Sequence, residues 1–168
     1  MDNGHFEIER KFLIKYPDMS LLRSRAQGTE ITQTYLKSPE KGISNRVRKR
    51  GSNGVYTYTH TVKTRINDMR KLEVEDEISE EEYTRLLQDA DPKRNTIYKE
   101  RWCLEYEGQM FEIDIFSFWQ DRAVMEIELR DESQPVCFPP EIEIIKEVTD
   151  DKRYTNSSMA KRLPEETV

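Results

Sequence analysis

Residues 6–12 read Phe-Glu-Ile-Glu-Arg-Lys-Phe, a stretch in which charged and apolar side chains largely alternate. Glu7, Glu9 and Lys11 stand two positions apart, and three of the four even-numbered positions are apolar. Residues two apart in a β-strand lie on the same face of the sheet. The stretch therefore predicts a β-strand with one charged face and one apolar face.

Pairs of like charges at the same spacing recur along the chain, and each pair has its own sign. The pairs are Arg46 and Arg48, Glu73 and Glu75, Lys99 and Arg101, Glu112 and Asp114, and Glu126 and Glu128. Like charges that face each other across a sheet are destabilising. The pattern therefore requires a neutralising partner, and a polyanion bridged by a divalent metal ion would supply one.

Period-two alternation and turn residues predict a chain made mainly of β-strands. Besides the first strand, we expect strands near residues 30–37, 44–50, 54–64, 70–78, 96–106, 110–117 and 123–130. Tight turns between strands favour antiparallel neighbours, and closure of the sheet removes its unpaired edges. We therefore predict a mainly β fold with flanking helices (α+β), built on an eight-stranded antiparallel closed β-barrel.

Three segments predict helices instead, and they span residues 17–26, 79–91 and 156–163. In the second segment, Ser79 and Glu82 have the spacing of a capping box, with Ser79 as the N-cap. The chain contains no internal repeat and no linker. We therefore expect residues 1–168 to form a single domain.

Composition limits the classes of function. Charged residues make up 36% of the chain and the formal net charge is −6. An acidic chain argues against general nucleic-acid binding, which needs a basic surface. No stretch reaches the ~18 apolar residues of a membrane-spanning helix, and the acidic first residues do not resemble a signal peptide.

Cysteine content gives a weaker indication of the compartment. The two cysteines, Cys103 and Cys137, form neither a metal cluster nor a disulfide framework. We expect a cytoplasmic protein whose partner is a small molecule, not nucleic acid or a membrane. The sequence leaves the oligomeric state open.

The alternating strands allow two orientations of the barrel wall. Apolar faces can fill the interior while charged faces meet water, which is the usual arrangement of half-solvated antiparallel strands. Alternatively, charged faces line the interior and apolar faces pack outward under helices. Solvent-facing surfaces normally mix both charge signs, whereas these strand faces do not. The residues by themselves leave both orientations open.

The segment Glu-Ile-Glu-Arg-Lys at residues 7–11 resembles the ExExK signature of the CYTH family, also called triphosphate tunnel metalloenzymes. Further elements follow in the order of that family: Asn45–Arg48, Lys63, Glu73–Glu75, Lys99–Arg101, Phe111–Phe116, Met125–Leu129 and Glu147–Asn156. The resemblance spans residues 5–160. It implies an eight-stranded antiparallel tunnel with a charged lumen, and so favours the inward orientation of the charges.

The resemblance also implies roles for the charged residues. A triphosphate carries about four negative charges, and arginine and lysine side chains together suit it well. The cations that we expect to bind it are Lys11, Arg46, Arg48, Lys63, Lys99, Arg101 and Lys152. Lys11 and Tyr35 resemble a lysine–tyrosine pair that assists water activation, although Tyr35 is equally compatible with ordinary packing in the barrel.

Carboxylates beside a triphosphate require a cation between them. Oxygen ligands without a His or Cys cluster suit Mg²⁺ or Mn²⁺. The candidate metal ligands are Glu7, Glu9, Glu73, Glu75, Asp114, Glu126 and Glu128. We expect Glu77 and Glu112 at the mouth of the tunnel, outside this set, and we interpret His5 and His60 as ordinary strand residues.

These residues predict a metal-dependent hydrolase of a small triphosphate, inorganic tripolyphosphate in the first place. Alternatives are an adenylyl cyclase of the class IV type, a thiamine triphosphatase, and a non-catalytic module that binds polyphosphate or nucleotides. The polar residues that hold the triphosphate would be the same in each case. Trp102 or Trp119 would stack on adenine in a cyclase, although tryptophan in such strands usually belongs to the core.

Overall fold

The computed structural model describes residues 4–38 and 40–168. Its strands are β1 (His5–Lys15), β2 (Ala26–Tyr35), β3 (Ile43–Ser52), β4 (Val55–Arg65), β5 (Arg70–Ile78), β6 (Ile97–Tyr106), β7 (Gln109–Phe116), β8 (Arg122–Glu128) and β9 (Ile144–Glu147). Its α-helices are α1 (Met19–Arg25), α2 (Glu80–Leu86) and α3 (Asn156–Lys161), and two 3₁₀ helices are η1 (Leu87–Asp89) and η2 (Lys152–Tyr154).

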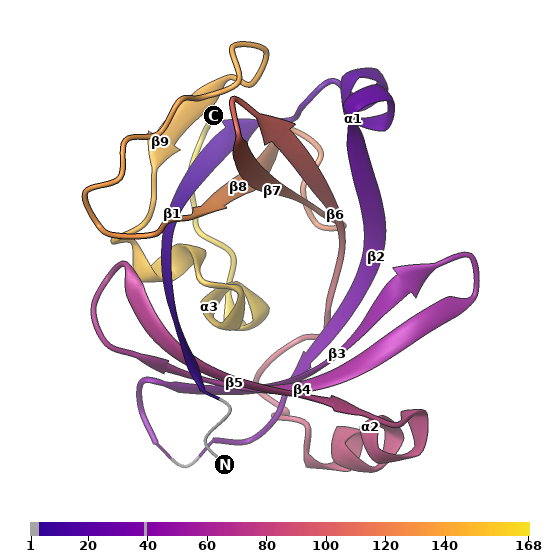
Figure 1. The fold of residues 1–168 in the computed structure, drawn as a ribbon. Coiled ribbons are helices and arrows are strands. Elements are labelled where there is room, and N and C mark those ends of the chain that lie inside the picture. Colours follow the sequence, from indigo (N-terminus) through magenta and orange to yellow (C-terminus); the bar gives the residue numbers. More distant parts are fainter. Residues whose placement is uncertain (1–3, 39) are drawn as a thin grey trace.

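Strand β1 closes the barrel by pairing on both of its sides. The strand order is β5-β4-β3-β2-β6-β7-β8-β1-β9, with an additional pairing of β5 with β1. The first residues of β1 lie antiparallel to β5, and those from Glu9 onward lie antiparallel to β8. Strands β1 to β8 therefore form the predicted closed antiparallel barrel (Figure 1). Short β9 lies beside the second half of β1, on the outside of this ring.

The eight predicted strands are all present, and the main differences from the prediction lie at the start of β2 and at the end of α2. β2 begins at Ala26 instead of near residue 30, so α1 is shorter than predicted. The hydroxyl of Ser79 accepts a hydrogen bond from the backbone N–H of Glu82 at 3.1 Å, which confirms the predicted cap of α2. That helix ends at Leu86 and continues as η1. Strand β9 was not predicted, because four residues are too few to show an alternation.

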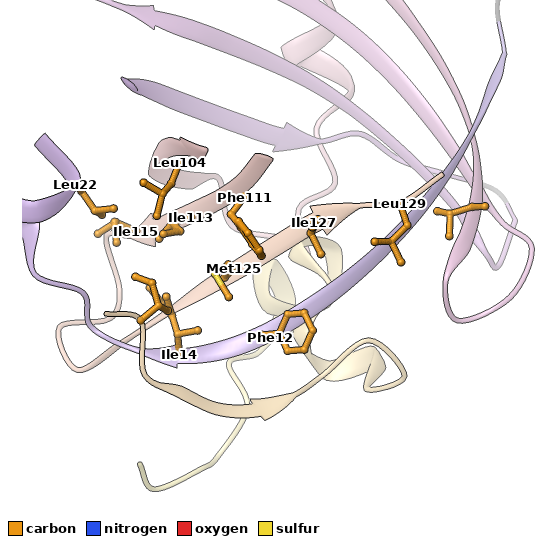
Figure 2. Packing of buried hydrophobic residues seen from close by; sticks show 13 residues of the cluster. Phe12, Ile14, Leu22, Leu104, Phe111, Ile113, Ile115, Met125, Ile127 and Leu129 are labelled. Carbon is orange, nitrogen blue, oxygen red and sulfur yellow. The ribbon is translucent and has the colours of Figure 1, made fainter. Parts of the chain in front are cut away.

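The apolar faces of β1, β7 and β8 point outward and are covered by other parts of the chain. The largest apolar cluster contains Phe12, Phe111 and Met125, and Leu22 of α1 belongs to it (Figure 2). The segment after β8 covers the same surface, where the ring of Phe138 meets that of Phe12 edge to face at 4.9 Å. Burying these side chains removes apolar surface from water, which stabilises the barrel from outside.

Three apolar residues decide the orientation of the barrel wall. Ile8 and Ile127 belong to the outer cluster. Val47 is completely buried and clusters with Tyr83 of α2, which covers β3 and β4. None of the three lines the central cavity, whereas their charged neighbours do. The inward orientation of the charged faces is therefore confirmed.

One end of the interior is filled with apolar side chains. Leu13 of β1 and Val124 of β8 form a cluster there with Tyr154 of η2 and with Met159 and Ala160 of α3. Helix α3 thus packs against the inner wall, which agrees with its place within the ring in Figure 1. Among the described residues, no helix has the length and apolar character needed to span a membrane.

Candidate active site

A cavity of about 620 Å³ lies inside the barrel, and we call it the tunnel. Every strand from β1 to β8 contributes a lining side chain. Its charged lining residues, among those described, are Glu7, Glu9, Lys11, Glu40, Lys41, Arg46, Arg48, Arg50, Lys63, Arg65, Lys71, Glu73, Glu75, Arg94, Lys99, Arg101, Glu112 and Glu126. Eleven are cations and seven are carboxylates, although the whole chain has a net charge of −6. The fold therefore concentrates positive charge in the tunnel.

Four cations of β3 and β6 are buried in the tunnel wall. Arg46, Arg48, Lys99 and Arg101 are each at most 9% exposed. The buried Nε of Arg46 has no hydrogen-bond partner among the described residues. Burial of an unpaired polar group costs free energy. Arg46 therefore has unused capacity to bind an anion.

Asp114 neutralises part of this charge from within the wall. Its carboxylate accepts hydrogen bonds from Lys99 Nζ at 2.7 Å and from Arg101 Nε and Nη2 at 2.8 and 2.9 Å. Burial opposes ionisation of Asp114, but Arg101 and Lys99 outweigh it and hold the pKa of this carboxyl well below its ordinary value. Burial also lowers the pKa of the Lys99 ammonium to about 7. Asp114 does not line the tunnel, so the structure does not bring this predicted metal ligand to the tunnel surface.

Gln33, which the sequence analysis did not assign to the site, connects Arg48 with Tyr35. Arg48 donates hydrogen bonds from Nε and Nη2 to Gln33 Oε1 at 3.2 and 2.8 Å. Gln33 in turn donates from Nε2 to the Tyr35 hydroxyl at 2.7 Å. Burial, together with repulsion from Arg46 and Arg101, lowers the pKa of Arg48 to about 9. Arg48 therefore lies beside a neutral partner and keeps its full charge near neutral pH.

Lys11 and Tyr35, the predicted catalytic pair, both line the tunnel. Lys11 Nζ donates a hydrogen bond to the backbone carbonyl of Tyr154 at 3.3 Å and lies 3.3 Å from an oxygen of Glu126. Tyr35 is engaged by Gln33 instead. The structure thus places the two side chains in one cavity with separate partners.

Carboxylates and lysines of β1, β4 and β5 form a second charged group in the tunnel. Lys63 Nζ lies 3.0 Å from Glu7 Oε2 and 3.2 Å from Glu73 Oε2, while Lys71 Nζ lies 2.6 Å from Glu9 Oε1. Burial opposes ionisation of Glu9, but Lys63, Lys71 and Lys11 hold its pKa at about 2. Glu9 is therefore ionised at neutral pH, as metal binding requires of a carboxylate ligand.

The tunnel carboxylates suit a hard divalent metal ion. The predicted ligands that line the tunnel are Glu7, Glu9, Glu73, Glu75 and Glu126. The buried Oε2 of Glu7 makes an ion pair with Lys63 but has no hydrogen bond of good geometry among the described residues. Oxygen ligands of this kind are those that Mg²⁺ and Mn²⁺ take in proteins. The donor set therefore fits these metals.

His5 joins two of these carboxylates, contrary to its interpretation as an ordinary strand residue. His5 faces Glu73 in the pairing of β1 with β5. Potential ligand atoms of His5, Glu7 and Glu73 all lie within 4.8 Å of one another. Period two gave a signal for this position, because His5, Glu7 and Glu9 belong to one face of β1. A nitrogen donor thus lies at the edge of the carboxylate group.

Two further predicted residues do not line the tunnel. Lys152 is exposed on η2, and Glu128 is exposed at the last position of β8. Partial desolvation of the carboxylate and repulsion from Glu7 raise the pKa of Glu128. Glu112, which was left out of the predicted metal ligands, does line the tunnel. Its carboxylate lies 2.6 Å from Arg101 Nη1.

The comparisons with known proteins agree with this geometry. A family model described as "CYTH domain" matches residues 5–154. An inorganic triphosphatase of Nitrosomonas europaea is 30% identical over 161 residues, which cover 94% of this chain and 99% of that protein. An inorganic triphosphatase of Acetivibrio thermocellus is 34% identical over 156 residues, which cover 92% and 93%.

A solved structure of an inorganic triphosphatase shares the fold. Its TM-score is 0.61 at 30% sequence identity, with 95% of this chain and 97% of that chain covered. The similarity therefore extends over nearly the full length of both chains. Since the family model also spans most of the sequence, this chain belongs to the CYTH domain family.

Proposed function

We propose that this protein is a metal-dependent hydrolase that cleaves inorganic tripolyphosphate inside the tunnel. The observation that carries this proposal is the charge of the tunnel lining, where cations exceed carboxylates by four in an acidic chain. A triphosphate, with about four negative charges, is a polyanion that suits this excess of cations. The two inorganic triphosphatases that resemble this chain over nearly its full length support the same substrate.

The cations would bind the phosphate oxygens and stabilise the charge that spreads over them during phosphoryl transfer. We assign this role to Lys11, Arg46, Arg48, Lys63, Lys99 and Arg101. Arg46 has a buried donor without a partner in the part of the chain that the structure describes, and Arg48 has a neutral amide as its partner. We leave out Lys152, because its side chain is exposed outside the tunnel lining.

Triphosphatases of the CYTH family depend on a metal ion in general. We propose that this chain uses Mg²⁺ or Mn²⁺, held by Glu7, Glu9, Glu73, Glu75 and Glu126. When bound, the ion would neutralise part of the phosphate charge. Lys63 now pairs with two of these carboxylates. Lys63 would bind the phosphate when these carboxylates hold the ion.

The tunnel lining favours an inorganic triphosphate over a nucleotide. Among the described residues, Tyr35 is the single aromatic side chain that lines it. Trp119 is buried in the apolar cluster near α3, and the indole N–H of Trp102 donates a hydrogen bond to Glu100. Neither tryptophan lines the tunnel as a surface on which adenine would stack. We therefore rank tripolyphosphate above ATP as the substrate.

A substrate panel tests the proposal. The purified protein would be incubated with tripolyphosphate, ATP or thiamine triphosphate, with Mg²⁺, with Mn²⁺ or with a chelator. We expect the fastest release of orthophosphate from tripolyphosphate, and no release with the chelator. Chromatography of the ATP reaction distinguishes orthophosphate from cyclic AMP.

Arg48→Ala serves as the loss-of-function control in this panel. Removal of one charge-stabilising donor costs about 10²–10³-fold in rate. Cyclic AMP as the main product would replace the proposal with the cyclase. Tight binding of tripolyphosphate without any turnover, whichever metal is added, would replace it with a non-catalytic binding module.

A further inference from the structure

A short chain of hydrogen bonds links β3 to the tunnel through β2. Arg48 lies opposite Gln33 in the antiparallel pairing of β3 with β2, and Tyr35 follows two residues later on the same face of β2. Gln33 is fully buried, and Tyr35 and Arg48 are 4% and 8% exposed. The three side chains are therefore held by packing as well as by their hydrogen bonds.

The direction of these hydrogen bonds follows from the chemistry of arginine. A guanidinium group only donates. The Gln33 atom that faces Arg48 at 2.8 and 3.2 Å must therefore be its carbonyl oxygen, which fixes the orientation of the amide. The amide nitrogen then faces the Tyr35 hydroxyl at 2.7 Å and donates to it. Because Arg48 can only donate, it fixes the Gln33 amide in the orientation in which the amide nitrogen donates to Tyr35.

This arrangement determines what the Tyr35 hydroxyl can do. Its oxygen already accepts the hydrogen bond from Gln33, so its own proton has to be donated elsewhere. No acceptor for this proton is found among the residues that the structure describes. Tyr35 lines the tunnel together with the cationic donors of β3 and β6, which include Arg46, Arg48, Lys99 and Arg101. A ligand oxygen bound in the tunnel would accept this proton.

We propose that Gln33 is a positioning residue that holds Tyr35 as a hydrogen-bond donor to a phosphate oxygen in the tunnel. The inference rests on the proposed function. It states that Tyr35 is the donor, and the substrate the acceptor, of one hydrogen bond. Gln33 also positions Arg48 without neutralising it, because the amide is uncharged. A glutamate at the same position would have the same shape and would reverse both effects.

Gln33→Glu is the variant that separates these roles. The introduced carboxylate would still accept from Arg48, but it would also accept the proton of Tyr35, which would then be withdrawn from the ligand. Tyr35→Phe removes the same donor directly. A hydrogen bond to a charged group corresponds to about a 10- to 100-fold change in affinity.

The experiment is a double-mutant cycle, with tripolyphosphate binding measured by calorimetry in the presence of a chelator and kcat and KM measured with metal. We expect Tyr35→Phe to weaken binding about 10- to 100-fold in the wild-type background and by less than about twofold in the Gln33→Glu background. Gln120→Glu, at an exposed position, controls for the change in net charge. Circular dichroism checks the fold of each variant.

Equal losses from Tyr35→Phe in both backgrounds would overturn the inference, because Gln33 would then not determine the role of Tyr35. If Gln33→Glu does not fold, Gln33→Met replaces it, and a full-sized effect of Tyr35→Phe in that background has the same meaning. Tripolyphosphate binding without hydrolysis would refute the proposed function while leaving this inference standing. A wild-type protein that does not bind tripolyphosphate would refute both.

Discussion

Single residues in the tunnel differ in how fully the protein neutralises their charge. Arg101 and Lys99 share the carboxylate of Asp114, whereas Arg48 has the neutral partner Gln33. Arg46 has a buried nitrogen without a partner among the described residues. Unpaired buried charge destabilises a protein unless a ligand compensates it. The uncompensated tunnel cations therefore lower the stability of the unliganded protein and favour the binding of an anion.

Lys99 gives the tunnel a measurable pH dependence. Burial lowers the pKa of its ammonium group to about 7, so its positive charge is present below that pH and lost above it. We expect Lys99→Met to weaken the binding of tripolyphosphate at pH 6, measured for the variant and the wild type in the presence of a chelator. The ratio of the two dissociation constants should fall toward one as the pH rises, by at most about tenfold per unit.

Calorimetric titrations of both proteins between pH 6 and pH 9 measure this ratio. Taking the ratio cancels the ionisation of the ligand itself. A ratio that stays constant across this range would contradict the assignment of a titrating Lys99.

Glu9 gives the protein a pH-dependent stability, and its contribution is lost as the pH falls. Its pKa is lowered from 4.5 to about 2, so ionised Glu9 stabilises the fold above pH 4.5, and this contribution is lost as the pH falls toward 2. We expect Glu9→Gln to lower the free energy of unfolding of the metal-free protein by about 1–3 kcal/mol at pH 7. Lys71 would also lose its partner at 2.6 Å.

Glu128→Gln is the matched control for this prediction. Glu128 lies opposite Glu9 in the pairing of β1 with β8, but its side chain is exposed and its pKa is raised. Urea denaturation of the metal-free variants at pH 7 should show no loss of stability for Glu128→Gln. A larger loss for Glu128→Gln than for Glu9→Gln would contradict the account.

At the scale of strands and helices, period-two patterns predicted the barrel well because each barrel strand has one charged or polar face. The same pattern also contained residues that the sequence analysis passed over. Lys71 is in phase with Glu73 and Glu75 on β5, and Gln33 is in phase with Tyr35 on β2. Assigning every second residue of each strand to the inward face would have identified both Lys71 and Gln33.

Other site residues were beyond the pattern for physical reasons. Lys152 belongs to a 3₁₀ helix, where alternation has no meaning. Glu128 is in phase with Glu126, but it ends its strand and is exposed. Asp114 is in phase with Glu112, yet Lys99 and Arg101 engage it within the wall. Spacing in the sequence specifies the face of the strand on which a residue lies. The partners of its side chain determine whether that side chain reaches the cavity.

The hairpin of β3 and β4 depends on one glycine. A Cβ atom on Gly51 would lie 1.9 Å from the carbonyl oxygen of Val55 and 2.9 Å from the Cα of Tyr56, both of them backbone atoms. We expect Gly51→Ala to lower the free energy of unfolding by about 1–3 kcal/mol, because the hairpin backbone has to move. Ser52→Ala, at the neighbouring exposed position, should change stability by less than about 0.5 kcal/mol. Equal stability of the two variants in urea would contradict the prediction.

At the scale of the whole molecule, the barrel is inverted relative to the usual half-solvated sheet. Helices α1 and α2 and the segment after β8 cover the apolar outside, while charged side chains face the tunnel. Alternation by itself is the same for either orientation, so the residues left it open. The family resemblance favoured the inward orientation, and the packing of Ile8, Val47 and Ile127 confirms it.

Ligand binding should stabilise the whole barrel, because it relieves repulsion among the tunnel cations. A ligand at about 100 times its dissociation constant adds about 2.7 kcal/mol. For a chain of this size, that free energy raises the melting temperature by about 5–10 °C. We expect such a shift with tripolyphosphate in a thermal denaturation series, and a much smaller shift for the double variant Arg46→Ala, Arg48→Ala. Equal shifts for both proteins would place the binding site elsewhere.

A crystal structure of the protein with tripolyphosphate and Mn²⁺ tests the central claim most directly. The account predicts tripolyphosphate inside the tunnel, with phosphate oxygens on Arg46 and Arg48. It also predicts an anomalous manganese peak beside the tunnel carboxylates, Glu7 and Glu9 among them. Tripolyphosphate and metal bound on the outer surface, with the tunnel cations still in their present pairs, would contradict it.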